Sequence, residues 1–304
     1  MENQCSGTPL KKFEFNTNRE RRDWTESNKN IRLFEFLSPA KQYLLDTFWG
    51  HEQDLDFQKY DLRSFFFDIE VEIEDEFPEP EFALYPINVI SVYDTMTGKI
   101  TAWTYRKDIF DVFSDGDIER ISKEVPDEFE KGLKIEINRF SSERDLLSSF
   151  IKFWRENFPD VLSGWNIVGF DIPYLINRIK KVFGEGKERE LSTINWYKNC
   201  VSLNKASDSY SIMGISICDY LLLYKKFISK SQSSWKLDYI AKKDLGKGKL
   251  DYYDLGYNSL REFMRKDFPT FVKYNLIDST LVKQIDDQRH FIKLMRKICN
   301  FRFS

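Results

Sequence analysis

Histidine and cysteine are scarce in this 304-residue chain, and their scarcity excludes several kinds of functional site. The two histidines, His51 and His290, cannot form a histidine-rich metal centre and offer little material for a serine-type catalytic triad. The four cysteines lie far apart without a CxxC pair, so we expect neither a zinc site nor a disulfide framework, which suits a reducing cytosol. The search for chemistry therefore turns to carboxylates.

Long apolar runs and an excess of positive charge are also missing. The N-terminus has no signal-peptide core, and no stretch approaches the roughly 20 apolar residues of a membrane span, so we expect a cytoplasmic protein without membrane contact. The formal net charge of -3 leaves no general basic surface. A nucleic acid would have to bind at local patches or through metal ions.

The composition is that of a globular protein, with 41% hydrophobic, 31% charged and 16% aromatic residues. A chain of this length favours one large domain with a smaller addition. Residues 1–60 begin with a polar, charged stretch and hold only short apolar patches, so we interpret them as a small, partly flexible N-terminal appendage. Residues 61–304 form the predicted main domain.

The main domain opens with patterns typical of strands. After three phenylalanines, residues 68–74 alternate between acidic and apolar side chains, as in a strand that leaves a buried sheet. Residues 87–93 and 99–105 predict two more strands, joined by a turn at 95–98. These three strands predict a meander.

Helical patterns alternate with strands in the rest of the domain. Ser141 is the expected N-cap of a helix that runs to Trp154. Together the patterns indicate a mixed α/β sheet flanked by helices. The other predicted elements are a strand at 161–166, a helix at 174–183, a loop or hairpin insertion at 184–213, a strand at 215–218, a helix at 233–241, a Gly/Lys loop at 242–249 and one long helix at 270–297.

Three segments carry acids that could perform chemistry, although each also has a purely structural interpretation. Strand alternation puts Asp68 and Glu70 on one face, where they could share a divalent cation or simply form a solvated strand end. Asp171 precedes a proline-initiated helix and could be an ordinary helix cap. Tyr274 and Asp278 share a helical face, functionally or as a structural pair.

In order and spacing, these segments resemble the three motifs of the DEDD exonuclease superfamily, tyrosine branch. The segment at 164–174, GWNIVGFDIPY, is particularly similar to the proofreading 3′–5′ exonuclease domain of family B DNA polymerases. The segments DYLLLYKKF at 219–227 and GKGKL at 246–250 resemble the T-even phage branch of that family. The resemblance begins near Leu62 and implies a ribonuclease H-like fold. If the protein is phage-encoded, the resemblance implies that it is located in the cytoplasm of the bacterial host.

Four carboxylates that converge on one cleft repel one another unless cations neutralise them. Ligands that are all oxygen favour two Mg²⁺ or Mn²⁺ ions, held with the help of water and the scissile phosphate. We expect Asp68, Glu70, Asp171 and Asp278 to be the metal ligands and, with Tyr274 orienting the attacking water, the catalytic residues.

Substrate contacts are expected from residues outside the acidic set. Phe77 resembles the aromatic residue of the family that stacks on a terminal base. Asn166 is a candidate for contact with the nucleic-acid backbone, and so are Lys247 and Lys249, although a solvated charged loop would explain the two lysines equally well.

The predicted function is two-metal-ion 3′–5′ exonucleolysis at single-stranded or mispaired DNA ends, releasing nucleoside 5′-monophosphates. No polymerase motif follows the third exonuclease motif, so we expect either a split subunit, whose polymerase partner is another chain, or a fragment of a longer polymerase. Two alternatives stay open. One is a non-catalytic DNA-end-binding or polymerase-scaffolding protein, and the other is a nuclease that acts on RNA, because the acids do not distinguish the 2′-hydroxyl.

Overall fold

The computed structural model describes residues 13–31, 61–72, 74, 78–228 and 231–301, and these fall into two units. The first unit contains a helix, α1 (Asn18–Ser27), which Thr17 caps by accepting a hydrogen bond from the amide of Glu20. Phe13 packs on Trp24 with ring centroids 4.6 Å apart. The second unit begins at Asp61 and contains the predicted site residues.

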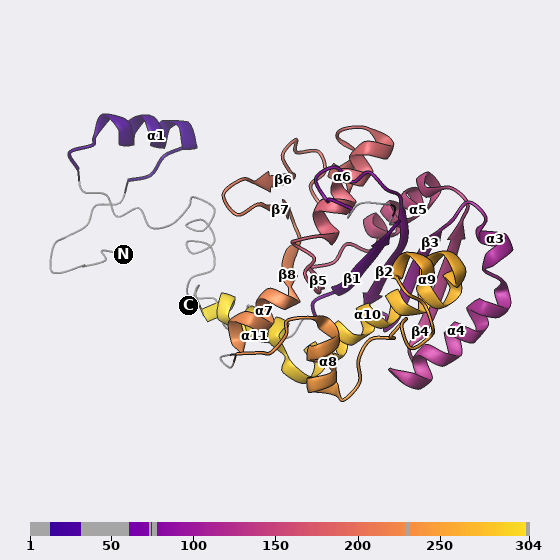
Figure 1. Cartoon of the computed structure of the whole chain (residues 1–304). Helices are drawn as coiled ribbons and strands as arrows, with labels where there is room; N and C mark the ends of the chain where they lie inside the picture. The colour runs from indigo at the N-terminus through magenta and orange to yellow at the C-terminus, as the bar shows by residue number, and fades with distance from the viewer. Residues whose placement is uncertain (1–12, 32–60, 73, 75–77, 229–230, 302–304) are drawn as a thin grey trace. The chain divides into compact units, whose positions relative to one another are not determined.

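A six-stranded mixed sheet forms the centre of the second unit, in the order β4-β3-β2-β1-β5-β8 (Figure 1). Antiparallel pairing joins the first three strands of the chain, which confirms the predicted meander. The flanking pairs β3–β4, β1–β5 and β5–β8 are parallel. The strands are β1 (Ser64–Val71), β2 (Ile87–Asp94), β3 (Lys99–Tyr105), β4 (Lys134–Phe140), β5 (Val161–Gly164) and β8 (Ser216–Asp219).

Helices cover both faces of this sheet, as the mixed α/β prediction requires. On one face, α10 (Phe268–Arg289) crosses β1, β2 and β3 and packs on α4, α8 and α9. On the other face, α5 (Glu143–Glu156) packs on β3, β4 and α6 (Asp171–Phe183). The other helices are α3 (Ile109–Val112), α4 (Asp115–Glu128), α7 (Tyr220–Phe227), α8 (Leu237–Leu245), α9 (Leu260–Lys266), α11 (Phe291–Phe301) and the 3-10 helix η1 (Lys187–Leu191).

Alternation along β1 divides its side chains between two hydrophobic cores. Phe65, Phe67 and Ile69 belong to the core under α5 and α6. Phe66 belongs to the core under α10. Because side chains alternate along a strand, Asp68 and Glu70 lie on the same face as Phe66, toward α10. The predicted alternation therefore sets the direction of both acids.

Several predicted boundaries are wrong, for local physical reasons. Ser142, rather than Ser141, caps α5, because its side chain accepts a hydrogen bond from the amide of Asp145. The single long helix predicted at 270–297 is interrupted at His290, which takes a left-handed conformation. Asp286 then caps the next helix, α11, by accepting a hydrogen bond from the amide of Ile292.

The predicted insertion at 184–213 contains η1 and a separate two-stranded hairpin of β6 (Val201–Asn204) and β7 (Ser209–Ile212). The helix predicted at 233–241 is α8, displaced toward the C-terminus, and the strand predicted at 161–166 ends at Gly164. No helix in the described ranges combines the length and apolar character that a membrane crossing needs.

Candidate active site

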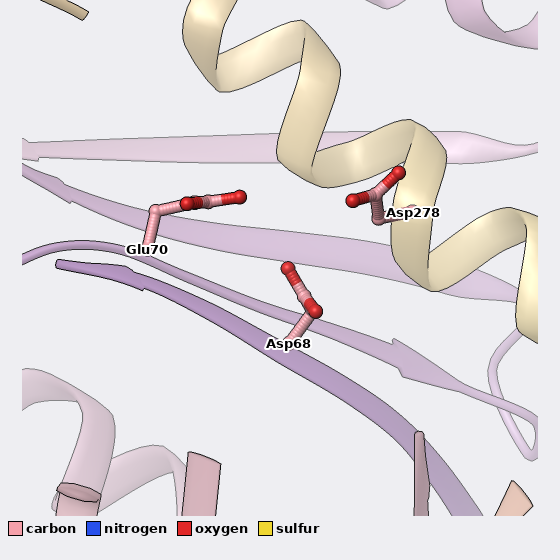
Figure 2. A group of neighbouring side chains, drawn as sticks. All are labelled: Asp68, Glu70 and Asp278. Atoms are coloured by element: carbon pink, nitrogen blue, oxygen red, sulfur yellow. The ribbon is translucent and has the colours of Figure 1, made fainter. Parts of the chain in front are cut away.

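Three carboxylates from two elements meet above the sheet (Figure 2). Asp68 and Glu70 project from β1, and Asp278 projects from α10. One oxygen from each lies within 4.8 Å of the others. Two segments far apart in sequence thus bring three predicted acids to one point, which excludes the solvated strand end as an explanation of Asp68 and Glu70.

Asp171 is the first residue of α6 and lies beside this group. Its Oδ1 atom accepts a hydrogen bond from the amide of Ile69 at 3.0 Å, between the two acids of β1. The parallel partner β5 pairs with β1 only as far as Phe66, so the side chain of Asp171 supplies an acceptor beyond the end of that pairing. Asp171 is not an N-cap of its own helix, because Phe170 occupies that position.

The turn between β5 and α6 depends on a close approach at Gly164. A Cβ atom there would lie 2.3 Å from the carbonyl oxygen of Phe67, so only glycine fits without a backbone shift. Asp219 supports the same turn, since its Oδ2 atom accepts a hydrogen bond from the amide of Val168 at 3.0 Å. Asn166 takes a positive φ of 64° in this turn, and its side chain is exposed.

Lys249 places a positive charge against the acidic group. Its ammonium group donates to Asp278 in a short ion pair and to the hydroxyl of Tyr274 at 3.1 Å. Tyr274 is 9% exposed and stacks on Phe271 with an interplanar angle of 9°. The predicted pair of Tyr274 and Asp278 is therefore joined through Lys249, which the sequence suggested only as a nucleic-acid contact.

Asp68 and Asp278 differ in the hydrogen bonds that their carboxylate oxygens accept. Asn275 is fully buried and donates from Nδ2 to Asp68 Oδ2 at 2.6 Å. Asp278 is 3% exposed, and its Oδ1 atom has no hydrogen-bond partner among the described residues. A buried carboxylate oxygen without a partner costs free energy, unless a group absent from the chain itself satisfies it.

Burial and mutual repulsion raise the pKa values of the acids. Burial, followed by the charges of Asp171, Asp278 and Glu70, raises the pKa of Asp68 well above its ordinary value. Burial, followed by the charge of Asp278, raises the pKa of Glu70 to about 8. Burial raises the pKa of Asp171 to about 7. Burial also raises the pKa of Asp278, although Lys249 opposes that shift. The charged forms are disfavoured, so the group would gain from a bound cation.

Burial and the charge of Asp278 also shift the pKa values of Lys249 and Tyr274. Burial alone would lower the pKa of Lys249, but Asp278, Tyr274 and Asp68 outweigh it and raise that pKa well above its ordinary value. Burial and the charge of Asp278 raise the pKa of the Tyr274 hydroxyl. At neutral pH the lysine is therefore charged and the tyrosine is a neutral phenol.

The donor set fits a hard divalent cation. All the acidic side chains offer oxygen, they are crowded, and one buried oxygen of Asp278 has no hydrogen-bond partner among the described residues. Asp68, Glu70 and Asp278 are the residues that could hold an ion together. Asp171 neighbours Asp68 but lies outside that triplet, so its role as a ligand stays a prediction.

The predicted nucleic-acid contacts are spread more widely. Phe77 lies outside the described residues. The ammonium group of Lys247 donates to the carbonyl oxygen of Phe129 at 2.9 Å and lies over the ring of that residue, at the end of α4. Asn166 is exposed in its turn. Nucleic-acid contact by these residues remains a prediction.

Comparison with known proteins agrees with this arrangement. A family model described as DNA polymerase family B, exonuclease domain, matches residues 41–240. The chain belongs to this family. The matched range contains Asp68, Glu70 and Asp171, whereas Tyr274 and Asp278 follow it. The resemblance inferred from the three motifs is thereby confirmed.

Phage polymerases are among the relatives of this family member. The chain is 35% identical over 299 residues to the DNA-directed DNA polymerase of Escherichia phage RB69, an alignment that covers 95% of the chain and 32% of the relative. It is 33% identical over 292 residues to that of Enterobacteria phage T4, covering 92% and 31%. The DNA polymerase catalytic subunit of human herpesvirus 7 is 28% identical over 177 residues, covering 55% and 17%. The chain thus spans about a third of the length of the phage relatives.

The sequence analysis did not identify Asn275, and it did not foresee the ion pair of Lys249 with Asp278. Asn275 lies between Tyr274 and Asp278, one helical turn before a residue of the site, so its position in the third motif was an available signal. Lys249 was identified as a residue of interest, but its ion pair with Asp278 depends on the docking of α10 beside α8 and on the loop after α8. No local pattern reports that contact.

Proposed function

We propose that this exonuclease domain hydrolyses phosphodiester bonds at single-stranded or mispaired 3′ ends of DNA and releases nucleoside 5′-monophosphates. The observation that carries the proposal is the meeting of Asp68, Glu70 and Asp278, with a buried oxygen of Asp278 unsatisfied. Two Mg²⁺ or Mn²⁺ ions are the proposed cofactors, with Asp171 as the fourth acidic ligand. Bound there, they would supply Lewis acidity and a water that ionises near neutral pH.

The side chains around the proposed metal site have distinct proposed roles. Asp68, Glu70 and Asp278 bring three carboxyl groups to one place, and Asn275 fixes the orientation of the Asp68 carboxyl group through its 2.6 Å hydrogen bond. Tyr274 keeps its proton, so it can orient a water molecule by hydrogen bonding but cannot serve as the base. Lys249 holds the tyrosine hydroxyl and places a cation where phosphate charge would develop.

The proposed substrate is an unpaired strand end. A paired end would first have to separate, at a cost of a few kcal/mol, before its last nucleotide reached the acids. Phe77, Asn166 and Lys247 are the proposed contacts to the strand, in addition to Lys249. Stacking on an aromatic side chain contributes about 1–3 kcal/mol per base without sequence preference, which suits an enzyme that edits any terminus.

The test is degradation of 3′-labelled and 5′-labelled oligonucleotides with millimolar Mg²⁺. We expect stepwise shortening from the 3′ end, faster on single-stranded and mismatched ends than on matched ends. Asp278→Ala, purified in parallel, controls for contaminating nuclease. Equal rates on matched and mismatched ends would contradict the choice of substrate, and complete inactivity with Mg²⁺ or Mn²⁺ would favour a DNA-end-binding or scaffolding role. Competition between matched DNA and RNA oligonucleotides decides the sugar preference.

We further propose that the polymerase part of a family B DNA polymerase presents the ends that this domain trims, in the cytoplasm of a bacterial host. This proposal is supported by the sequence identity between the chain and the phage DNA polymerases, of whose length the chain covers about a third. Residues 61–304 would act as the exonuclease domain and residues 1–60 as an appendage. Co-purification from the native host at low salt tests the association, and failure to recover any polymerase would contradict it.

A further inference from the structure

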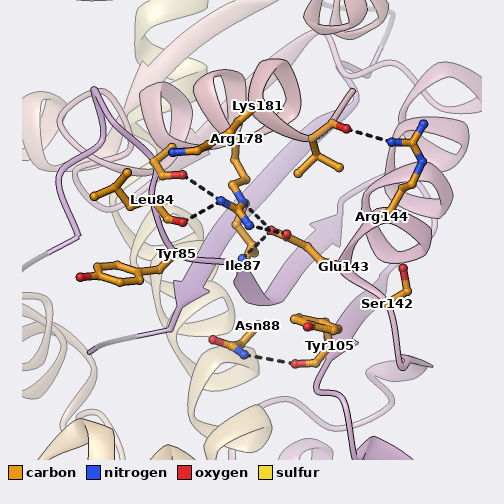
Figure 3. Close-up of polar contacts among 12 residues, drawn as sticks. Leu84, Tyr85, Ile87, Asn88, Tyr105, Ser142, Glu143, Arg144, Arg178 and Lys181 are labelled. Carbon is orange, nitrogen blue, oxygen red and sulfur yellow. Dashed lines mark hydrogen bonds and ion pairs between the residues drawn. The ribbon is translucent and has the colours of Figure 1, made fainter. Parts of the chain in front are cut away.

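A buried ion pair joins α5 and α6 (Figure 3). Arg178 of α6 donates from Nε and Nη2 to the two carboxylate oxygens of Glu143, the first residue of α5, at 2.7 and 2.6 Å. The side chains are 11% and 10% exposed. Paired guanidinium and carboxylate groups in this parallel arrangement are geometrically specific as well as strong.

Both members of the pair also hold main chain of the segment that leads into β2 (Figure 3). Glu143 Oε1 accepts a hydrogen bond from the amide of Ile87 at 2.9 Å. Arg178 Nη1 donates to the carbonyl oxygens of Ala83 and Leu84 at 3.0 and 2.9 Å. The pair therefore fixes the last residues before the strand and the first residue of the strand.

Two other side chains of α6 also form hydrogen bonds with the main chain of the segment before β2. Tyr174 exchanges two hydrogen bonds with the main chain of Tyr85, at 2.7 and 3.1 Å. Asn177 donates to the carbonyl oxygen of Pro80 at 3.0 Å. Positions 174, 177 and 178 lie on one helical face, so α6 presents a row of side chains to the segment at 80–87.

Ile87 is directly connected to the metal-binding end of β1. It pairs with Val71, whereas Glu70 pairs with Val89, so the ladder contains an irregularity next to Glu70. The extra residue on β2 is Asn88, whose side-chain amide donates to the carbonyl oxygen of Tyr105 at 3.2 Å. Irregularities of this kind change the direction of neighbouring side chains.

We propose that the Arg178–Glu143 pair positions Glu70 for metal binding by fixing Ile87 and hence the irregularity opposite Glu70. Neither side chain is among the acids that gather at the site, so both are positioning residues. The inference rests on the proposed metal site.

A matched control lies at the other end of the same two strands. Arg63 donates to Asp94 from Nε and Nη2 at 3.1 and 2.7 Å, and Asp94 pairs with Phe65 across the ladder. This pair has the same chemistry and similar burial, with side chains 22% and 5% exposed. It lies away from the irregularity at Glu70.

The experiment measures Mn²⁺ affinity of the metal-free full chain by calorimetry, without any activity assay. Glu143→Ala should weaken the affinity by up to about tenfold, the lower limit for loss of a group that hydrogen-bonds a metal ligand, because Glu143 acts on Glu70 only through Ile87. Glu143→Gln keeps an acceptor for the amide of Ile87, so it should recover most of that loss. Asp94→Ala should lower the melting temperature and leave the Mn²⁺ affinity unchanged. Arg178→Met provides a second test if Glu143→Ala does not fold.

The outcomes separate this inference from the proposed function. Unchanged Mn²⁺ affinity in both Glu143→Ala and Arg178→Met, or an equal loss in Asp94→Ala, would overturn the positioning role while leaving the metal site intact. Absence of Mn²⁺ binding by the unmodified chain at millimolar concentration would overturn the metal site and, with it, the positioning role. Selective weakening at Glu143, with recovery in Glu143→Gln, supports the inference.

Discussion

Lys249 lies against Asp278, and the same ammonium group holds the hydroxyl of Tyr274 at 3.1 Å. This lysine supplies a positive charge to the acidic group from within the chain. Its charge offsets part of the repulsion among the buried carboxylates when no metal is bound. The contact therefore links the stability of the protein to the state of its candidate site.

We predict that Lys249→Met lowers the free energy of unfolding of the metal-free protein by about 1–3 kcal/mol, since it leaves the Asp278 carboxylate without its donor. Saturating Mg²⁺ should recover more stability in the variant than in the unmodified protein. Urea denaturation with and without Mg²⁺ measures both quantities. Lys242→Met, which removes a largely exposed partner of Asp238, is the matched control and should change little. Equal effects of the two substitutions would contradict the prediction.

The acids and the tyrosine should differ in their importance for catalysis. We expect Asp68→Ala and Asp278→Ala to reduce exonuclease activity by at least about 10³-fold, because each removes a proposed metal ligand. Tyr274→Phe should retain measurable activity, with a loss of about 10–100-fold, because it removes only a group that orients water. Single-turnover rates on a labelled single strand measure the difference. Comparable losses in the three variants would show that this ranking is wrong.

The stability of the metal-free protein should fall as pH rises. The folded-state pKa of Glu70 is about 8, against an ordinary value of 4.5, so between these values the folded protein holds a proton that the unfolded chain has lost. The resulting stability is fully present below pH 4.5 and is lost as pH rises through about 8. Asp171, with a pKa of about 7, acts in the same direction.

Urea midpoints measured between about pH 5 and pH 8 check this prediction. Metal binding should flatten the dependence on pH, because a bound cation favours the charged acids. Glu70→Gln, measured without metal, should also flatten it. A metal-free midpoint that stays constant or rises over this range would contradict the prediction.

Asn275→Asp should place a further carboxylate beside Asp68 with almost no change in shape. We expect a lower melting temperature without metal and a substantial recovery on adding Mg²⁺, because the added charge joins the acidic group. Asn138→Asp also introduces an acid at a partly buried asparagine, but that side chain donates to the carbonyl oxygen of Ala102 from β4, at the edge of the sheet. Mg²⁺ should not recover the stability of that control. Thermal melts of both variants with and without Mg²⁺ distinguish the two positions.

Gly164→Ala should destabilise the protein by several kcal/mol, because its Cβ atom would approach the Phe67 carbonyl oxygen to 2.3 Å and displace the backbone next to Asp68. Gly116→Ala, within α4, meets only a side-chain atom at 3.7 Å and should be neutral or slightly stabilising. Thermal unfolding compares the two. An equally mild effect at both glycines would show that the turn after β5 tolerates a side chain.

The sequence predicted those parts of the fold that depend on local patterns. Alternation along β1 correctly placed Asp68 and Glu70 on one face, and the turn at 95–98 correctly joined β2 to β3. By contrast, β4 was not predicted, although Ile135 and Ile137 alternate with polar residues as is typical of a strand. The interruption at His290 also escaped prediction, because Asp286 caps the following helix without a local sequence signal.

For the candidate site, the acids were predictable and their partners were not. Asp68, Glu70 and Asp278 follow from the motifs, and the structure brings them together. The ion pair of Lys249 and the support given by Glu143 to Ile87 are long-range contacts between elements with ordinary local sequences. Such contacts depend on tertiary packing, which residue periodicity does not encode.

The acidic group also has a consequence for the timing of biosynthesis. Asp68 and its hydrogen-bond partner Asn275 are 207 residues apart, and Asp278 follows on the same helix. A ribosome therefore synthesises the acids of β1 long before the helix that completes the group, and the contact forms only after closure of a very long loop. A nascent chain cannot assemble the three-carboxylate group before α10 has emerged and docked. The three acids can therefore come together only late in the synthesis of the described residues.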